Sequence, residues 1–74
     1  MPSEIGEKLI GILAPSFGNA VAKAKVIAAC HLGGTDIEIV KKADLPPVAG
    51  RLEQLCQSLG PKVATSIKER ALAL

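Results

Sequence analysis

The stretch from Ser16 to Leu32, Ser-Phe-Gly-Asn-Ala-Val-Ala-Lys-Ala-Lys-Val-Ile-Ala-Ala-Cys-His-Leu, decides the fold of this chain. Good helix formers fill it, and alanine occurs on nearly every side of the helix that it would form. A helix that is apolar on most sides is normally buried among other helices. Ala20, Ala24 and Ala28 follow a four-residue spacing on one face, which lets neighbouring backbones approach closely. We therefore expect a buried helix over 16–32, capped by Ser16, as the packing axis of a small bundle.

The length of the chain, 74 residues, leaves room for a single domain over 1–74. A domain of this size buries only about 60% of the surface of its unfolded chain, so its stability is marginal. Phe17 is the only aromatic residue, and aromatic side chains bury the most area per residue. Close packing of aliphatic side chains, or a second copy of the chain, must then stabilise the core. These observations favour a homodimer or a higher oligomer.

Charge and cysteine content indicate the environment of the protein. The net charge of +2 is too small to indicate nucleic acid or an anionic membrane by itself. The start of the chain lacks the basic and apolar segments of a secretory signal, and Lys23 and Lys25 interrupt the longest apolar stretch. Two cysteines without a secretory signal are typical of a reducing compartment. We expect a cytoplasmic protein that does not bind a membrane; whether it is a fragment of a larger chain stays open.

An amphipathic helix precedes the central one. Ser3 is a suitable N-cap, and Pro15 predicts an end at Leu13. The apolar face of this first helix has helical spacing and carries Ile5, Leu9, Ile12 and Leu13.

The glycine pair at 33–34 marks the end of the central helix, with one glycine in the left-handed conformation. Thr35 followed three residues later by Glu38 is the pattern of a capping box, which predicts a short helix from Asp36. The alternation over 37–39 is also compatible with a strand, and this alternative stays open.

Two further helices complete the chain. The first runs from Pro46 to Leu59, and the dipeptide at 60–61, Gly-Pro, separates it from the last. The inward residues of the first are Val48, Leu52, Leu55, Cys56 and Leu59. Those of the last are Val63, Ile67, Ala71 and Leu74. The sequence therefore predicts an all-α fold, a small bundle of four to five short helices.

Few side chains could carry chemistry. Cys30 and His31 are adjacent, so on a helix they point about 100° apart and suit one metal ion poorly. To complete a metal site, the chain offers only Cys56 and scattered carboxylates. A catalytic cysteine is a separate possibility, and it needs a base within reach. A disulfide between Cys30 and Cys56 is the alternative to two free thiols. We expect free thiols, and no catalytic site, cofactor, metal ion or small-molecule substrate.

One segment suggests a different function. Residues 35–46 have the pattern Thr-x-x-Glu-Ile-Val-x-x-Ala-Asp-Leu-Pro. This pattern resembles the second helix and turn of helix-turn-helix DNA-binding domains, whose next helix enters the major groove. The resemblance implies a dimeric DNA-binding regulator that reads DNA with the helix after Pro46. Its basic residues would be Lys41, Lys42, Arg51 and Lys62.

The main functional hypothesis is a non-enzymatic helical module that self-associates and binds another protein. The first and last helices are short and amphipathic, and such helices can dock their apolar face on a partner. The expected interface residues are Ile5, Leu9, Ile12, Leu13, Val63, Ile67 and Leu74.

Overall fold

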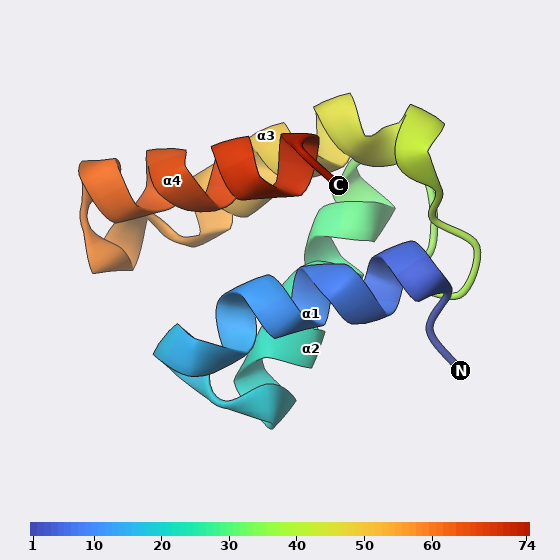
Figure 1. Cartoon of the computed structure of the whole chain (residues 1–74), viewed down its shortest axis with the longest axis horizontal. Helices are drawn as coiled ribbons and strands as arrows, with labels where there is room; N and C mark the ends of the chain where they lie inside the picture. Colours follow the sequence, from blue (N-terminus) through green and yellow to red (C-terminus); the bar gives the residue numbers. More distant parts are fainter.

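Four α-helices and two 3-10 helices make up the computed structural model, which describes residues 1–74. The elements are, in chain order, α1 (Glu4–Phe17), α2 (Asn19–Leu32), the 3-10 helix η1 (Lys42–Asp44), α3 (Leu45–Leu55), the 3-10 helix η2 (Gln57–Leu59) and α4 (Pro61–Leu72). α1 with α2, and α3 with α4, form two hairpins; α2 also packs on α3, and α1 on α4 (Figure 1). This arrangement confirms the predicted all-α bundle. None of the helices combines the length and the apolar character needed to cross a bilayer.

Glycine forms both hairpin junctions. Gly18 has φ 81° and ψ 160°, and Gly60 has φ 97° and ψ 152°, a region that strains any residue with a Cβ. Gly18 alone separates α1 from α2, whereas Gly60 separates η2 from α4. The predicted start of the central helix at Ser16 is therefore wrong, because α2 begins at Asn19. The left-handed glycine expected after this helix is Gly34, with φ 83°.

α1 begins as predicted but runs further. The Ser3 side chain accepts a hydrogen bond from a backbone N–H of the first turn at 3.0 Å, which confirms it as the N-cap. The predicted end at Leu13 is wrong, because the helix continues through Pro15 to Phe17. Proline removes the helical hydrogen bond to the Gly11 carbonyl. Gly11 is exposed, so water can donate to that carbonyl and the helix tolerates the proline.

The connection between the hairpins, residues 33–41, contains neither the predicted short helix nor the alternative strand. The side chain of Asp36 accepts a hydrogen bond from the N–H of Glu38 at 2.9 Å, and its carbonyl accepts one from the N–H of Val40 at 2.8 Å. Asp36, and not Thr35, thus caps a single turn that does not continue. The bundle therefore has four α-helices and lacks the expected fifth.

The first residues of the chain hold this turn against α1. The backbone N–H of Ser3 donates to the Ile37 carbonyl at 2.9 Å, and the Ser3 hydroxyl donates to the Val40 carbonyl at 2.7 Å. Gly6 makes the approach possible, because a Cβ there would lie 2.6 Å from the Ile37 carbonyl oxygen. These contacts use backbone groups that a longer helix would have needed for itself.

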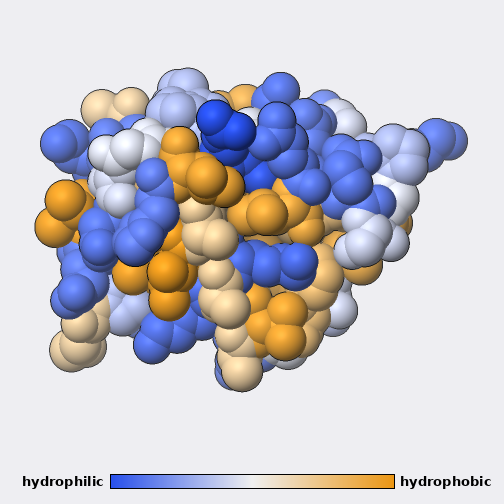
Figure 2. All heavy atoms as spheres, turned by 180° about the vertical axis from the view of Figure 1, so that it is seen from behind, coloured by the Kyte–Doolittle hydropathy of each residue, from blue (hydrophilic) through white to orange (hydrophobic).

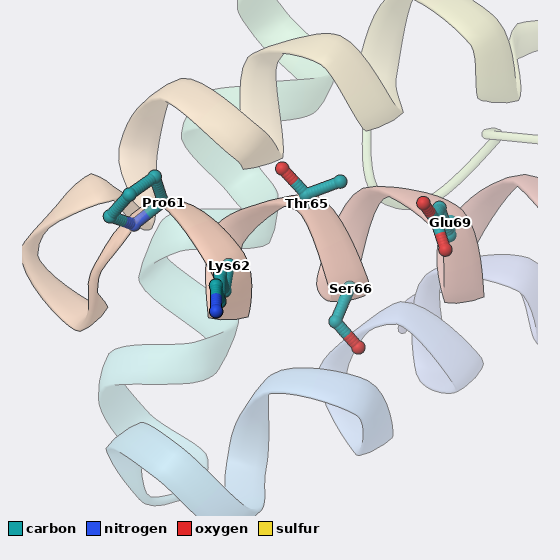
Figure 3. A pocket seen from close by; sticks show the side chains of 5 residues that line it. All are labelled: Pro61, Lys62, Thr65, Ser66 and Glu69. Carbon is teal, nitrogen blue, oxygen red and sulfur yellow. The ribbon is translucent and has the colours of Figure 1, made fainter.

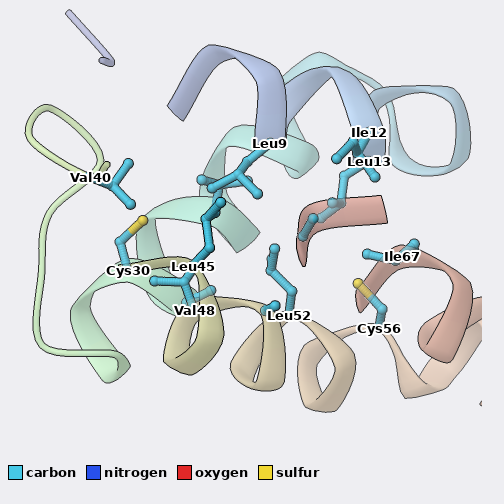
Figure 4. Close-up of a cluster of buried hydrophobic side chains, with 14 of the residues drawn as sticks. Leu9, Ile12, Leu13, Cys30, Val40, Leu45, Val48, Leu52, Cys56 and Ile67 are labelled. Atoms are coloured by element: carbon cyan, nitrogen blue, oxygen red, sulfur yellow. The ribbon is translucent and has the colours of Figure 1, made fainter. Parts of the chain in front are cut away.

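Eighteen buried apolar residues, drawn from the four helices and the connection, form one core. Leu9, Leu13 and Leu52 are fully buried and lie at its centre (Figure 4). Cys30 and Cys56 are free thiols, as predicted, and lie at opposite ends of this cluster (Figure 4).

The buried face of α4 differs by one position from the predicted face. Ala64, Ile67 and Ala71 are buried, whereas Val63 is 42% exposed. Leu74 packs against the core and is partly buried. Alanine lies at two of the three contact positions, so α4 can approach α3 closely.

Candidate protein-interaction surface

α2 buries only one side. Its buried residues are Ala22, Val26, Ala29 and Cys30. On the opposite side, six apolar residues and one histidine lie exposed or partly exposed. We call this set the α2 strip: Ala20, Val21, Ala24, Ile27, Ala28, His31 and Leu32. Ile27 is partly buried against the core, while Ala20, Val21, Ala24, His31 and Leu32 are exposed, so most of this helix face is in contact with water.

The two large apolar side chains of the α2 strip that are well exposed, Val21 and Leu32, lie near its two ends. Val21 is 48% exposed and Leu32 is 55% exposed. Figure 2 shows apolar atoms down the middle of the face seen from behind, with further apolar atoms and interspersed hydrophilic side chains beside them. Apolar surface with polar side chains around it is the usual form of a surface that another protein covers.

One edge of the α2 strip carries opposite charges. Lys23 has no ion-pair partner within the chain. It lines a hollow of about 270 Å³ together with Ile27 of the strip and Glu38 of the connection. The N-terminal ammonium of Met1 lies 3.2 Å from a carboxylate oxygen of Glu38. This edge therefore presents a free ammonium group beside a carboxylate.

The other edge carries a lysine that is already engaged. Lys25 Nζ donates to the Leu55 carbonyl at 3.0 Å and lies 4.7 Å from the centre of the Phe17 ring. The hydrogen bond and the cation–π contact hold Lys25 against α3 and away from the strip.

Most of the interface residues predicted from sequence belong to the core of the single chain. Ile5, Leu9, Ile12, Leu13 and Ile67 are at most 8% exposed, so they hold the four helices together. Such side chains cannot meet a partner unless the fold opens. Only Val63, and in part Leu74, remain at the surface.

The basic residues of the DNA-binding alternative lie on three different elements. Lys41 and Lys42 are at the start of η1, Arg51 is on α3, and Lys62 is on α4; all four are exposed. The guanidinium of Arg51 donates to Gln54 at 3.2 Å. The helix-turn-helix arrangement is wrong, because a turn replaces its second helix. DNA binding itself stays a prediction.

The groups capable of nucleophilic chemistry are held in unreactive surroundings. Burial raises the pKa of the Cys30 thiol from 9.0 to about 11, and the charges of Asp36 and Asp44 add to the effect. Burial also raises the pKa of the Cys56 thiol. His31 is exposed, with Nε2 3.4 Å from an Asp36 oxygen. A thiol of raised pKa carries little thiolate at neutral pH and is a weak nucleophile or metal ligand.

A second hollow, of about 340 Å³, lies along the outer side of α4. Its lining residues are Pro61, Lys62, Thr65, Ser66 and Glu69 (Figure 3). Thr65 points towards α3, where its hydroxyl donates to Glu53 at 3.2 Å. The lining is polar and no buried group points into the hollow, so it has the character of ordinary surface.

Comparison with known proteins gives no further assignment, because no family model, curated protein or solved structure matches the chain. The candidate surface therefore rests on the chain's own geometry. Its signal was visible in the sequence as the spacing of Ala20, Ala24 and Ala28. That spacing predicts that these three alanines pack against a neighbouring helix, and within the chain this prediction is wrong, because the fold leaves them outside the core.

Proposed function

We propose that this chain is a small non-enzymatic helical module that self-associates and mediates protein–protein interaction. The observation that carries the proposal is the α2 strip, a largely exposed apolar helix face on a small domain with a single aromatic residue. Contiguous apolar surface on a folded domain is typical of interaction sites.

The free energy available to such an interaction is modest. Burying a whole Val or Leu side chain stabilises by about 1.5–3 kcal/mol. About half of Val21 and of Leu32 is still exposed, so covering each contributes roughly 1 kcal/mol. The alanines add little area but allow close approach of a partner backbone. We expect a complex that forms and dissociates readily.

A cytoplasmic location forms part of the proposal. Both cysteines are free thiols, which is typical of proteins from a reducing compartment. Their raised pKa values also fit a protein that does no thiol chemistry.

The test is the molar mass of the purified chain as a function of concentration, by sedimentation velocity. We expect the mass to rise towards a dimer or higher oligomer in the wild type. Ala24→Glu places a charge in the middle of the strip and should keep the chain monomeric. Ala43→Glu, at an exposed alanine of η1 outside the strip, is the matched control and should behave as wild type. A wild-type chain that stays monomeric at the highest attainable concentration contradicts self-association.

A further inference from the structure

We infer that residues 36–40 of the connection form a lid over the Cys30 thiol, and that this lid opens on its own while the four helices stay packed. Residues 1–3 hold the lid closed. Opening uncovers Cys30 together with the part of the core that Ile37 and Val40 cover. The inference concerns a motion of the fold and does not depend on the proposed self-association.

The lid covers the thiol through Val40. Cys30 is 0% exposed and Val40 is 1% exposed, and the Cys30 sulfur points towards Val40 (Figure 4). Burial raises the pKa of this thiol most, and the charges of Asp36 and Asp44 raise it further. Both carboxylates therefore lie near the thiol, one at the start of the lid and one just after it. Access to Cys30 thus reports whether the lid is closed.

Few contacts hold the lid, and the polar ones come from one short segment. Every hydrogen bond between the connection and residues more than ten positions away is made by Met1 or Ser3. Ser3 donates two of them to lid carbonyls, and the Met1 ammonium pairs with the exposed carboxylate of Glu38. An exposed ion pair adds little stability in water. These contacts can break at the loss of no more helical structure than the first turn of α1, which Ser3 caps.

Both ends of the lid permit the motion. Gly34 has φ 83°, and no atom lies within 4 Å of the place where its Cβ would be. At the other end, Lys41 is exposed and its backbone is extended. Inside the lid, Asp36 accepts hydrogen bonds from the N–H groups of Glu38 and Val40, so the turn keeps these bonds as it moves. A segment with its own hydrogen bonds and unconstrained ends opens as one unit.

Cys56 provides a reference thiol within the same chain. It is as fully buried as Cys30, but it directly follows α3, and its N–H donates to the Leu52 carbonyl of that helix at 3.0 Å. Its sulfur points towards Ile67 of α4 (Figure 4). Exposure of Cys56 therefore requires α3 and α4 to separate, which is unfolding of the bundle.

The lid borders the candidate interaction surface. Ile37 of the lid lines the same hollow as Ile27 of the α2 strip and Lys23. An open lid removes Ile37 from this hollow and adds core surface to the exposed side of α2. The lid therefore links exposure of Cys30 to the extent of the apolar surface that the chain presents.

Thiol labelling of the folded chain tests the lid. The wild type is treated with iodoacetamide at pH 8 in urea concentrations below the unfolding transition. Labelling is measured in the tryptic peptides 26–41 and 52–62, which carry one thiol each. We expect Cys30 to react at least about tenfold faster than Cys56 at low urea, with little dependence on urea, because local opening exposes little surface. The Cys56 rate should rise steeply with urea.

A different result would overturn the inference. If Cys30 reacts no faster than Cys56, and both rates have the same dependence on urea, the thiol becomes accessible only when the whole fold opens.

Two variants separate opening of the lid from unfolding of the bundle. Ile37→Ala removes an apolar contact of the lid and should raise the Cys30 rate about tenfold or more. Leu52→Ala weakens the contacts between the helices, so it should raise the Cys56 rate strongly and leave the Cys30 rate almost unchanged. Acceleration of both thiols by the same factor in Leu52→Ala would mean a single shared opening and would refute the lid. The wild-type comparison decides the question even where a variant does not fold.

Discussion

The close contact between Gly6 and the connection makes a paired prediction on α1. Gly6 and Gly11 both lie in the same helix, and helix propensity favours alanine over glycine by about 1 kcal/mol at either position. Their surroundings differ. A Cβ at Gly11 meets nothing within 4 Å, whereas a Cβ at Gly6 lies 2.6 Å from the Ile37 carbonyl oxygen.

The magnitudes follow from this difference. Gly11→Ala should stabilise the fold by about 1 kcal/mol, because it reduces the freedom of the unfolded chain without a clash. Gly6→Ala gains the same propensity, but the carbonyl is backbone and must move, at a cost of about 1–3 kcal/mol. That movement also weakens the two Ser3 hydrogen bonds to the connection, each contributing about 1 kcal/mol. We expect a net destabilisation of about 1–3 kcal/mol for Gly6→Ala.

Thermal and urea unfolding, followed by circular dichroism at low protein concentration, measure both variants against the wild type. For a domain of this size, 1 kcal/mol shifts the Tm by roughly 4–8 °C. Gly11→Ala should therefore melt above the wild type and Gly6→Ala below it. Equal stabilisation by both variants would refute the close contact and the position of the connection over α1.

Three further predictions concern the core, the acid response and the thiols. Leu52→Ala, at a fully buried side chain, should lower the free energy of unfolding in urea by about 2–5 kcal/mol. Val21→Ala, on the α2 strip, should change the free energy of unfolding of the monomer by no more than about 0.5 kcal/mol. Equal losses in the two variants would contradict the one-sided burial of α2. The Glu38 N–H, aided by His31, holds the pKa of Asp36 below its ordinary value of 3.8. The stability that this turn contributes is therefore present above pH 3.8 and is lost as the pH falls through the lowered value. Thermal melts in this acid range should show that Asp36→Asn responds less to pH than wild type does; an identical response would count against the turn. Ellman's reagent at pH 8 should label the folded chain far more slowly than the urea-unfolded chain, because Cys30 is buried and its pKa is about 11. Rapid labelling of the folded chain would contradict this burial.

Local signals in the sequence predicted much of this fold. Capping by Ser3 depends only on the Ser3 side chain and the first turn of the same helix, and the structure confirms this cap. The Gly60–Pro61 boundary was likewise predictable, because glycine permits the junction and proline suits the first turn of the next helix. Features that depend on neighbours within a few residues are the ones that sequence patterns describe well.

The features that the sequence did not predict depend on distant contacts. Gly18, and not Pro15, separates the first two helices: water can donate to the Gly11 carbonyl that the proline leaves free, and Gly18 adopts a φ of 81°. Asp36 forms the 36–40 turn locally, but Ser3, far away in the chain, holds it against α1 by binding two of its carbonyls. The α2 strip was expected to be buried, since periodicity identifies an apolar face but not how many helices are present to cover it.

The attachment of the connection to the first residues has a practical consequence for making the protein. An affinity tag ahead of Met1 would remove the ammonium group that pairs with Glu38 and would place extra chain beside the hollow that Lys23 lines. Both effects fall on the edge of the α2 strip. Expression vectors that place the tag after Leu74, or that leave Met1 as the first residue after proteolysis, keep that edge as it is in the structure for binding studies.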